Sequence, residues 1–210
     1  MTATAEDPRT LRALDDATRS LIRLAAVVSG GTEQAIREAM AVAHGEVPSV
    51  WVEELLLQSY LFAGFPRALN AMREWRRYEP EIATSPNPSD PDSTRDDGEA
   101  TCSAVYGSMY ERLRQNIRAL HPLLDDWMIT EGYGKVLSRP ALDLGRRELC
   151  IVAACAASGQ DRQLHSHLHG AVNVGVAPSV IDQALDALAD ILGAERARAV
   201  GLLWARVKRK

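Results

Sequence analysis

The stretch that decides the fold is residues 143–185, DLGRRELCIVAACAASGQDRQLHSHLHGAVNVGVAPSVIDQAL, because the chain contains a second version of it. Residues 15–55 read DDATRSLIRLAAVVSGGTEQAIREAMAVAHGEVPSVWVEEL, at an offset of 128 positions that becomes 130 after a two-residue insertion. The shared positions include the pairs Asp15 and Asp143, Gly45 and Gly175, and Pro48 and Pro178. Because caps and turns recur while polar residues differ, the pattern predicts a repeated helical scaffold in which only one copy contains a candidate catalytic site.

Helical spacing of apolar residues extends through both copies. In the first copy, Gly and Pro residues divide the pattern into expected helices at 11–29, 32–43, 48–63 and 67–78. In the second, helices are expected at 100–129 with a break at Pro122, and at 143–157, 160–174, 180–192 and 194–208. The segment EGYGKVLSRPALD between them reads as a turn. Since no segment alternates as a strand does, the sequence predicts an all-α fold.

The boundary between the copies is residues 79–100, EPEIATSPNPSDPDSTRDDGEA. Four prolines with Ser, Asp and Asn leave little to bury, so this segment is expected to be a flexible acidic linker. The predicted organisation is therefore a first, degenerate repeat at 1–78, the linker, and a second repeat at 101–210 that carries the candidate site.

The bulk composition excludes several classes of protein. A net charge of −4 and the lack of a basic aromatic face argue against nucleic-acid binding. No apolar run approaches the roughly 20 residues of a membrane span, and the acidic start MTATAEDPRT lacks a signal-peptide core. The three cysteines do not form a disulfide framework. We therefore expect a cytoplasmic protein with free thiols.

The second copy holds a candidate catalytic pair, Glu148 and His167, on either side of a hairpin turn at Gly159. At 1.5 Å per residue, Glu148 lies about 16 Å before the turn and His167 about 12 Å after it. The two side chains are therefore at nearly the same height, and a carboxylate can orient an imidazole as a general base. The plainer alternatives are an acid placed by the helix dipole and a hydrogen-bonded, half-buried histidine.

The run His165-x-His167-x-His169 suggests a metal site, but a helix brings only His165 and His169 to one face. Without a third ligand on another element, the sequence predicts no metal. Cys150 and Cys155 lie about 140° apart around a helix, so they cannot readily bridge, and buried thiols are expected. Cys102 has no evident partner.

The frame G-x-V-x-S-R-P-x-L-D, then R-x-L, then L-x-x-H-x-x-x-A-x-x-x-G-V-x-P, in residues 134–178, resembles the carboxymuconolactone decarboxylase family. The first copy, with EELLLQSYLFAGFPRALNAM, looks like the helix that follows in the same family. The resemblance implies an AhpD-like helical bundle built of two such repeats. It further implies a lyase without a cofactor, a small-molecule substrate, and a homo-oligomer such as a dimer, trimer or hexamer.

One subgroup of the family, the AhpD-like alkylhydroperoxidases, carries the spacing E-x11-C-x2-C-x3-H. Here the same spacing reads Glu148, Gln160, Gln163 and His167, so both redox cysteines are glutamines. Peroxide reduction needs a thiolate and a resolving thiol, which amides cannot supply. The corresponding first-copy residues are Ser20, Thr32, Ala35 and Ala39, none of them ionisable.

These observations lead to one main hypothesis and two alternatives. The main one is a decarboxylase acting on a small carboxylated lactone or related acid, with His167 moving a proton and Glu148 orienting it. The expected substrate-binding residues are Arg139, Arg146, Arg147, Gln160, Gln163 and Tyr60. The last helix lacks the H-x-x-x-Y-x-G-x-P region typical of decarboxylases, which leaves the substrate open. The alternatives are a thiol redox protein, which the glutamines disfavour, and a non-catalytic, oligomeric ligand-binding protein.

Overall fold

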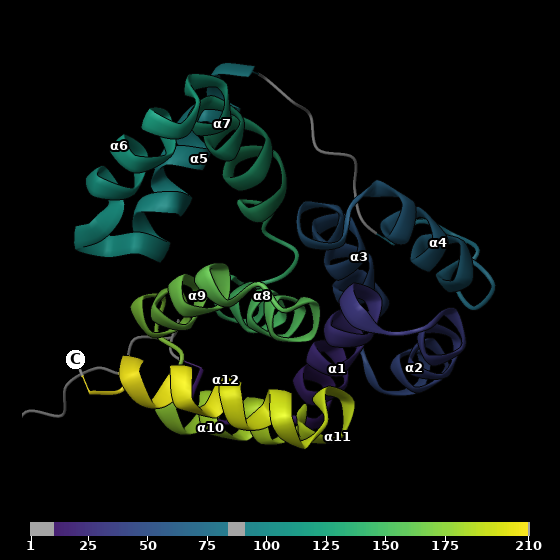
Figure 1. Cartoon of the computed structure of the whole chain (residues 1–210). Coiled ribbons are helices and arrows are strands. Elements are labelled where there is room, and N and C mark those ends of the chain that lie inside the picture. Colours follow the sequence, from purple (N-terminus) through teal and green to yellow (C-terminus); the bar gives the residue numbers. More distant parts are fainter. Residues whose placement is uncertain (1–10, 84–90, 210) are drawn as a thin grey trace, which may run out of the picture.

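The computed structural model describes residues 11–83 and 91–209, and within these it is all helical (Figure 1). The predicted all-α fold is confirmed: no strand occurs in the described ranges, and Leu11 pairs with Val176 as an isolated parallel bridge. The acidic N-terminus 1–10 and residues 84–90 of the expected linker lie outside the described residues. No helix in the described part of the chain is long and apolar enough to cross a membrane.

The first half of the chain forms the four helices that were predicted. They are α1 (Asp16–Gly30), α2 (Glu33–Glu46), α3 (Ser49–Ala63) and α4 (Phe65–Trp75). The Asp15 carboxylate accepts a hydrogen bond of 2.6 Å from the Thr18 backbone N–H, and the Thr32 hydroxyl caps α2 in the same way. Such caps satisfy N–H groups that have no partner inside the helix, and each contributes about 1 kcal/mol.

Residues 91–137 form an arm of helices, of which the sequence predicted the part at 100–129 but not the two ends. The arm contains α5 (Pro91–Tyr106), a 3₁₀ turn (Gly107–Met109), α6 (Tyr110–Leu120), α7 (Pro122–Trp127) and the π-helical segment η2 (Met128–Leu137). The expected linker is thus wrong from Pro91 onward, where proline is tolerated in the first helical turn. The turn expected over residues 131–143 is wrong up to Leu137.

Two glycines explain how the arm forms where a linker and a turn were expected. A Cβ atom at Gly98 of α5 would collide with the Ile129 carbonyl oxygen, and one at Gly134 of η2 would collide with the Thr94 carbonyl oxygen. The backbones of α5 and η2 therefore approach so closely that only glycine fits at these two positions. The predicted break at Pro122 is present, since α6 ends at Leu120 and α7 begins at Pro122.

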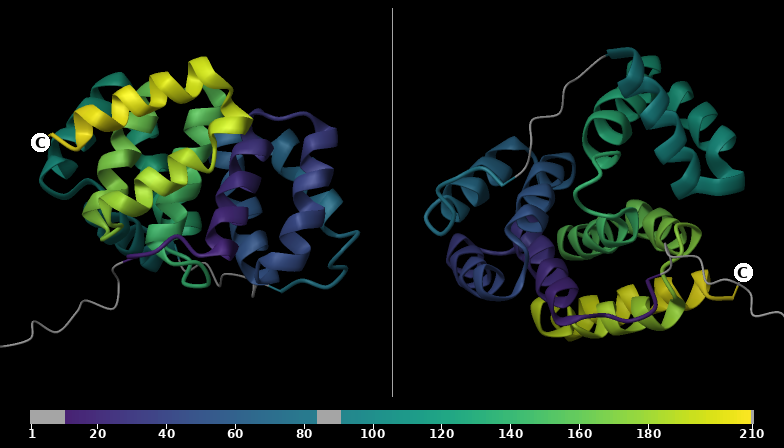
Figure 2. Two further views of the ribbon diagram at one scale, coloured as in Figure 1. Left: turned by 90° about the horizontal axis from the view of Figure 1, so that it is seen from below. Right: turned by 180° about the vertical axis from the view of Figure 1, so that it is seen from behind.

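The second half continues with α8 (Leu144–Ser158), α9 (Asp161–Asn173), α10 (Pro178–Asp186), α11 (Ala189–Leu192) and α12 (Ala194–Val207). Asp143 caps α8 by accepting from the Arg146 backbone N–H at 2.9 Å. Gly159 adopts φ 74°, the left-handed conformation that ends α8 and turns the chain into α9. Figure 2 shows α10 to α12 along one side of the α8–α9 hairpin and the arm on the other.

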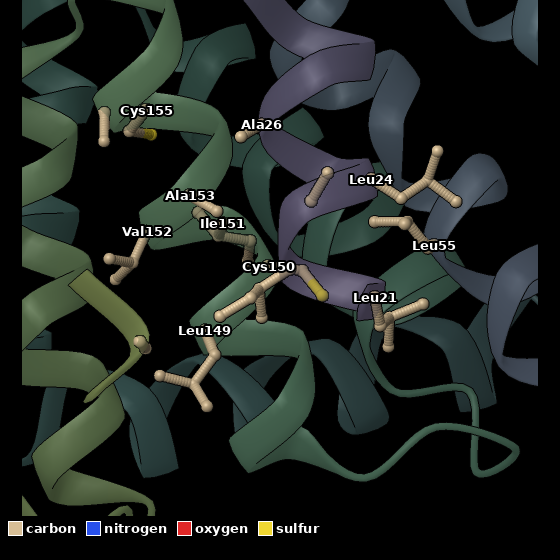
Figure 3. Close-up of a cluster of buried hydrophobic side chains, with 14 of the residues drawn as sticks. Leu21, Leu24, Ala26, Leu55, Leu149, Cys150, Ile151, Val152, Ala153 and Cys155 are labelled. Carbon is tan, nitrogen blue, oxygen red and sulfur yellow. The ribbon is translucent and has the colours of Figure 1, made fainter. Parts of the chain in front are cut away.

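The core is centred on the contact between α1 and α8, which run side by side in the same direction. Arg146 near the start of α8 binds Asp15 and Thr18, and Gly30 at the end of α1 lies directly against the Ala157 carbonyl. Figure 3 shows apolar side chains meeting here, among them Leu21 and Ile151, both fully buried. Burying one such side chain contributes about 1.5–3 kcal/mol. The first half is therefore the support on which α8 is held.

Candidate functional site

The structure brings Glu148 of α8 and His167 of α9 into direct contact, and we call this pair the dyad. The His167 Nδ1 lies 2.8 Å from Glu148 Oε2, with Glu148 fully buried and His167 5% exposed. When the Nδ1–H group donates a hydrogen bond to the carboxylate, Nε2 is the ring nitrogen left to contact a ligand. The other carboxylate oxygen, Oε1, is buried without a hydrogen-bond partner among the described residues.

Gly170, one turn after His167, makes room for the dyad. A Cβ atom at Gly170 would lie 2.5 Å from Glu148 Oε2 and 2.7 Å from Val105 Cγ1. Both distances are shorter than any van der Waals contact, so a larger residue would push the carboxylate aside. The glycine is thus part of the geometry that seats Glu148 against His167.

His167 lies at the wall of a large groove between the arm, α3–α4 and α9. The groove has a volume of about 1220 Å³, and Figure 1 shows the three groups of helices that border it. Most of its lining is apolar or aromatic; this part comprises Leu57, Tyr60, Leu61, Phe62, Phe65, Ile82, Tyr106, Leu113, Ile117, Leu124, Trp127, Met128, Tyr133, Val136 and Leu137. A proton-transfer group facing an apolar space is an arrangement suited to catalysis, because low polarity strengthens electrostatic interactions.

Two tyrosines that sequence reasoning missed stand beside the dyad. Tyr106 of α5 lies edge-on to the imidazole, with ring centroids 6.4 Å apart, and Tyr133 of η2 lies 6.2 Å from Tyr106. Burial raises the pKa of both phenols, and the nearby Glu148 carboxylate raises it further. Both therefore remain protonated donors at neutral pH. In the sequence, Tyr133 lies in the segment that was interpreted as a turn, so it was not proposed as a site residue.

Arg147, expected to bind substrate, is fully buried and occupied. Its guanidinium donates to Glu54 at 2.6 Å, to Gln58 at 3.1 Å and to the carbonyl oxygens of Arg139 and Leu142. Glu54 is also fully buried, so the pair is a structural link between α3 and α8. The structure leaves Arg147 no donor that faces the groove.

The other expected arginines are also engaged. Arg146 bonds Asp15 and Asp143 at the N-terminal ends of α1 and α8, and its guanidinium stacks 4.3 Å from the Trp51 ring centroid. It does not line the groove. Arg139 does line the groove, but it forms an ion pair with Glu54 at 2.8 Å.

The uncharged residues that were predicted to bind substrate also differ in whether they line the groove. Tyr60 and Gln163 line the groove, whereas Gln160 precedes α9 and does not. Arg162, which sequence reasoning missed, lines the groove beside Gln163. Its side chain is exposed and makes no ion pair with the described residues. No sequence signal separated it from other surface arginines, because ion pairing with distant residues is visible only in the fold.

The thiols and the remaining histidines are not placed to act as nucleophiles or metal ligands. Cys102, Cys150 and Cys155 are buried and free, and burial raises the pKa of Cys102 and Cys155 to about 12. A thiol with such a pKa is a poor nucleophile at neutral pH. His165 and His169 face each other with ring centroids 4.9 Å apart. Within the described ranges, no group of three His, Cys, Asp or Glu residues could hold a metal ion.

Fold and site together define an all-α protein with a buried carboxylate–imidazole dyad at the wall of an apolar groove. Residues 123–206, which include the dyad, match the sequence model of the Carboxymuconolactone decarboxylase family. The expected family is thereby confirmed, whereas the tandem repeat remains a prediction, since the match leaves the first half outside it.

A similar curated protein is "Peroxisomal protein 2" of Schizosaccharomyces pombe. It is 28% identical over 141 residues, which cover 61% of this chain and 63% of that relative. The chain thus matches somewhat less than two thirds of the relative's length, and the relative's name states no reaction.

Proposed function

We propose that the chain is a cofactor-free decarboxylase acting on a carboxylated lactone or related acid. The observation that carries the proposal is the contact between His167 Nδ1 and Glu148 Oε2 at the wall of the groove. The match of residues 123–206 to the carboxymuconolactone decarboxylase family supports the same reaction class. The substrate class is chosen because such an acid can lose CO₂ without a cofactor when its carbonyl group accepts the electrons.

The proposed step needs only a proton from the protein. The bond between the carboxylate carbon and the ring carbon breaks, CO₂ leaves, and the electron pair moves into conjugation with the lactone carbonyl. The His167 imidazolium then delivers a proton from Nε2 to carbon, and the neutral imidazole recovers it from water. Glu148 stabilises the imidazolium and fixes the ring. Tyr106 and Tyr133, held protonated, can donate to the developing negative charge on the carbonyl oxygen.

The test is CO₂ release from carboxymuconolactone and from carboxylated lactones with apolar substituents. We expect His167→Ala to lower turnover by 10²- to 10⁴-fold, the range for loss of a general acid or base. The matched control is His165→Ala, two residues earlier on α9 but paired with His169, which should retain turnover. Equal turnover in the two variants would reject the assignment of His167.

We also propose that the chain forms a homo-oligomer. Leu120 is 74% exposed and Leu123 49% exposed on neighbouring helices of the arm, outside the groove. Adjacent exposed leucines suit a contact with another copy. Sedimentation analysis should give a mass above that of one chain, and this mass should fall in a variant that carries both Leu120→Glu and Leu123→Glu. A monomer in the unmodified protein would refute the oligomer.

The cytoplasmic location stays a prediction, to be compared with a peroxisomal one by imaging a tagged chain.

A further inference from the structure

The groove is larger and more apolar than a small carboxylated lactone requires. Ligand pockets have volumes of about 300–1,000 Å³, and this groove reaches about 1220 Å³. Phe62 and Phe65 contribute from the first half, and Leu113, Leu124 and Trp127 from the arm. Phe65 is 61% exposed and Trp127 53% exposed, so these rings present apolar surface that a ligand could cover.

The charges of the groove leave one cation without a partner. Of its charged lining residues, Lys135 pairs with Glu131 at 3.2 Å and Arg139 pairs with Glu54 at 2.8 Å. Arg162 alone among the described lysines and arginines of the lining makes no ion pair. The groove therefore offers a positive charge next to a mainly apolar surface.

Arg162 and His167 lie five residues apart on α9, and both line the groove. Arg162, Gln163 and Ser166 line the groove with His167, and Gln163 is one helical turn before His167. A carboxylate bound by the Arg162 guanidinium and the Gln163 amide would thus hold the adjoining carbons toward the His167 imidazole. The opposite end of such a ligand would extend over the aromatic and aliphatic residues of the arm.

We propose that the groove binds amphipathic carboxylic acids, with the carboxylate on Arg162 and an extended apolar body along Phe62, Leu124 and Trp127. This assignment deepens the proposed function by naming its substrate class: an acid with an apolar body rather than a small polar lactone. Arg162 is then the residue that determines specificity, in place of the three arginines expected from the sequence.

The experiment is calorimetric titration of the full chain with butanoate, hexanoate and octanoate, and with octanol as the uncharged analogue. We expect the Kd to fall by up to about fourfold per added methylene, the effect of burying one CH₂. Arg162→Gln should raise the Kd of octanoate about tenfold, as expected for the loss of a charged hydrogen bond. The binding of octanol should not change. Arg198→Gln is the matched control, because Arg198 is exposed on α12, outside the groove.

Leu124→Glu provides a second variant that should fold normally, since Leu124 is 48% exposed. A carboxylate there should weaken octanoate binding by repelling its charge and wetting the groove. Equal Kd values for Arg162→Gln and Arg198→Gln, or a Kd that is independent of chain length, would overturn the assignment. So would an unmodified chain that binds no octanoate because a second copy fills the groove.

Binding and turnover separate this inference from the proposed function. Octanoate binding that depends on Arg162, without CO₂ release from any acid tested, would reject the decarboxylase and retain the binding site. CO₂ release at equal catalytic efficiency in Arg162→Gln and Arg198→Gln would retain the decarboxylase and reject the binding site.

Discussion

The α1–α2 and α8–α9 segments are both helical hairpins, which the sequence predicts to be related, and they differ in the side chains that they carry. Both begin with an aspartate cap, Asp15 and Asp143, and α1 and α8 lie against each other along the core. At the positions that correspond to Glu148 and His167, the first hairpin has Ser20 and Ala39. The Ser20 hydroxyl donates instead to Glu46 at the end of α2. A helical hairpin can thus be kept for support while its partner carries the ionisable groups.

The comparison extends to a glycine. Gly170 allows the Glu148 carboxylate to approach α9, whereas the residue before Ala41, the counterpart of Ala171, is Met40. Met40 is fully buried. The first hairpin thus has a buried apolar side chain where the aligned position of the second has a glycine beside the dyad, a difference between packing and placing charge.

The largest expected effect is on stability, and it should distinguish one arginine of each hairpin. Arg147 and its counterpart Arg19 occupy equivalent positions, but only Arg147 is buried in an ion pair with Glu54. Arg147→Ala should lower the free energy of unfolding by about 3 kcal/mol, because it removes a fully buried side chain and leaves the buried Glu54 carboxylate with only its ion pair to Arg139. Arg19→Ala should change it by less than about 0.5 kcal/mol. Urea denaturation of both variants measures this, and similar midpoints would show that Arg147 is not the structural link.

The next effect concerns activity at the position of Glu148. Glu148→Gln keeps the shape but removes the charge that stabilises the His167 imidazolium, so CO₂ release should fall about 10²-fold. Ser20→Ala, at the equivalent position, should leave turnover unchanged. Comparable losses in both variants would mean that the site is not confined to the second hairpin.

A smaller effect tests the glycine. Gly170→Ala places a Cβ atom 2.5 Å from Glu148 Oε2 and should cost about 1–3 kcal/mol of stability, together with turnover. Gly201→Ala in α12 is the control, since its Cβ would meet nothing within 4 Å. It should stabilise the chain by about 0.5–1 kcal/mol, as alanine does in helices. Thermal unfolding distinguishes the two, and equal melting temperatures would contradict the packing argument.

The smallest expected effect is on the stability of the arm, for which no counterpart was identified in the first half. Hydrogen bonds from Arg114 and Arg118 hold the pKa of the Asp125 carboxyl below its ordinary value. A lowered folded-state pKa stabilises the protein above about pH 4 and stops doing so as the pH falls through that lower pKa.

Asp125→Asn should therefore reduce stability at pH 7 by about 1 kcal/mol, with the difference from the unmodified chain shrinking below about pH 4. Urea denaturation at a series of pH values measures it. A difference that stays constant down to pH 2 would show that the charge of Asp125 is not what matters.

Local features of the fold were predictable and long-range pairings were not. Asp15, Thr32 and Asp143 could be identified as caps because capping acts over three residues. The contact between Glu148 and His167 followed from their heights on one hairpin. The pairing of Arg147 with Glu54 spans 93 positions, so the sequence showed three arginines without showing which remained available.

The two ends of the arm, residues 91–99 and 131–137, were the other failure, for a related reason. Gly98 and Gly134 read locally as breakers, but here they serve the close approach of two backbones, a requirement that arises only when α5 and η2 are packed together. Burial between these elements outweighed the low helix propensity of the segment. Tyr133 was missed with it, because the interpretation as a turn gave it no fixed place. Tyr106 lay in the helix expected at 100–129 and was missed because its contact with His167 joins residues far apart in the sequence.

The glycine contacts between α5 and η2 also matter for protein engineering. Because Gly98 and Gly134 lock these elements backbone to backbone, substitutions on the groove side of α6 and α7, such as at Leu113 or Leu124, can redesign the ligand-facing surface without redesigning the arm itself.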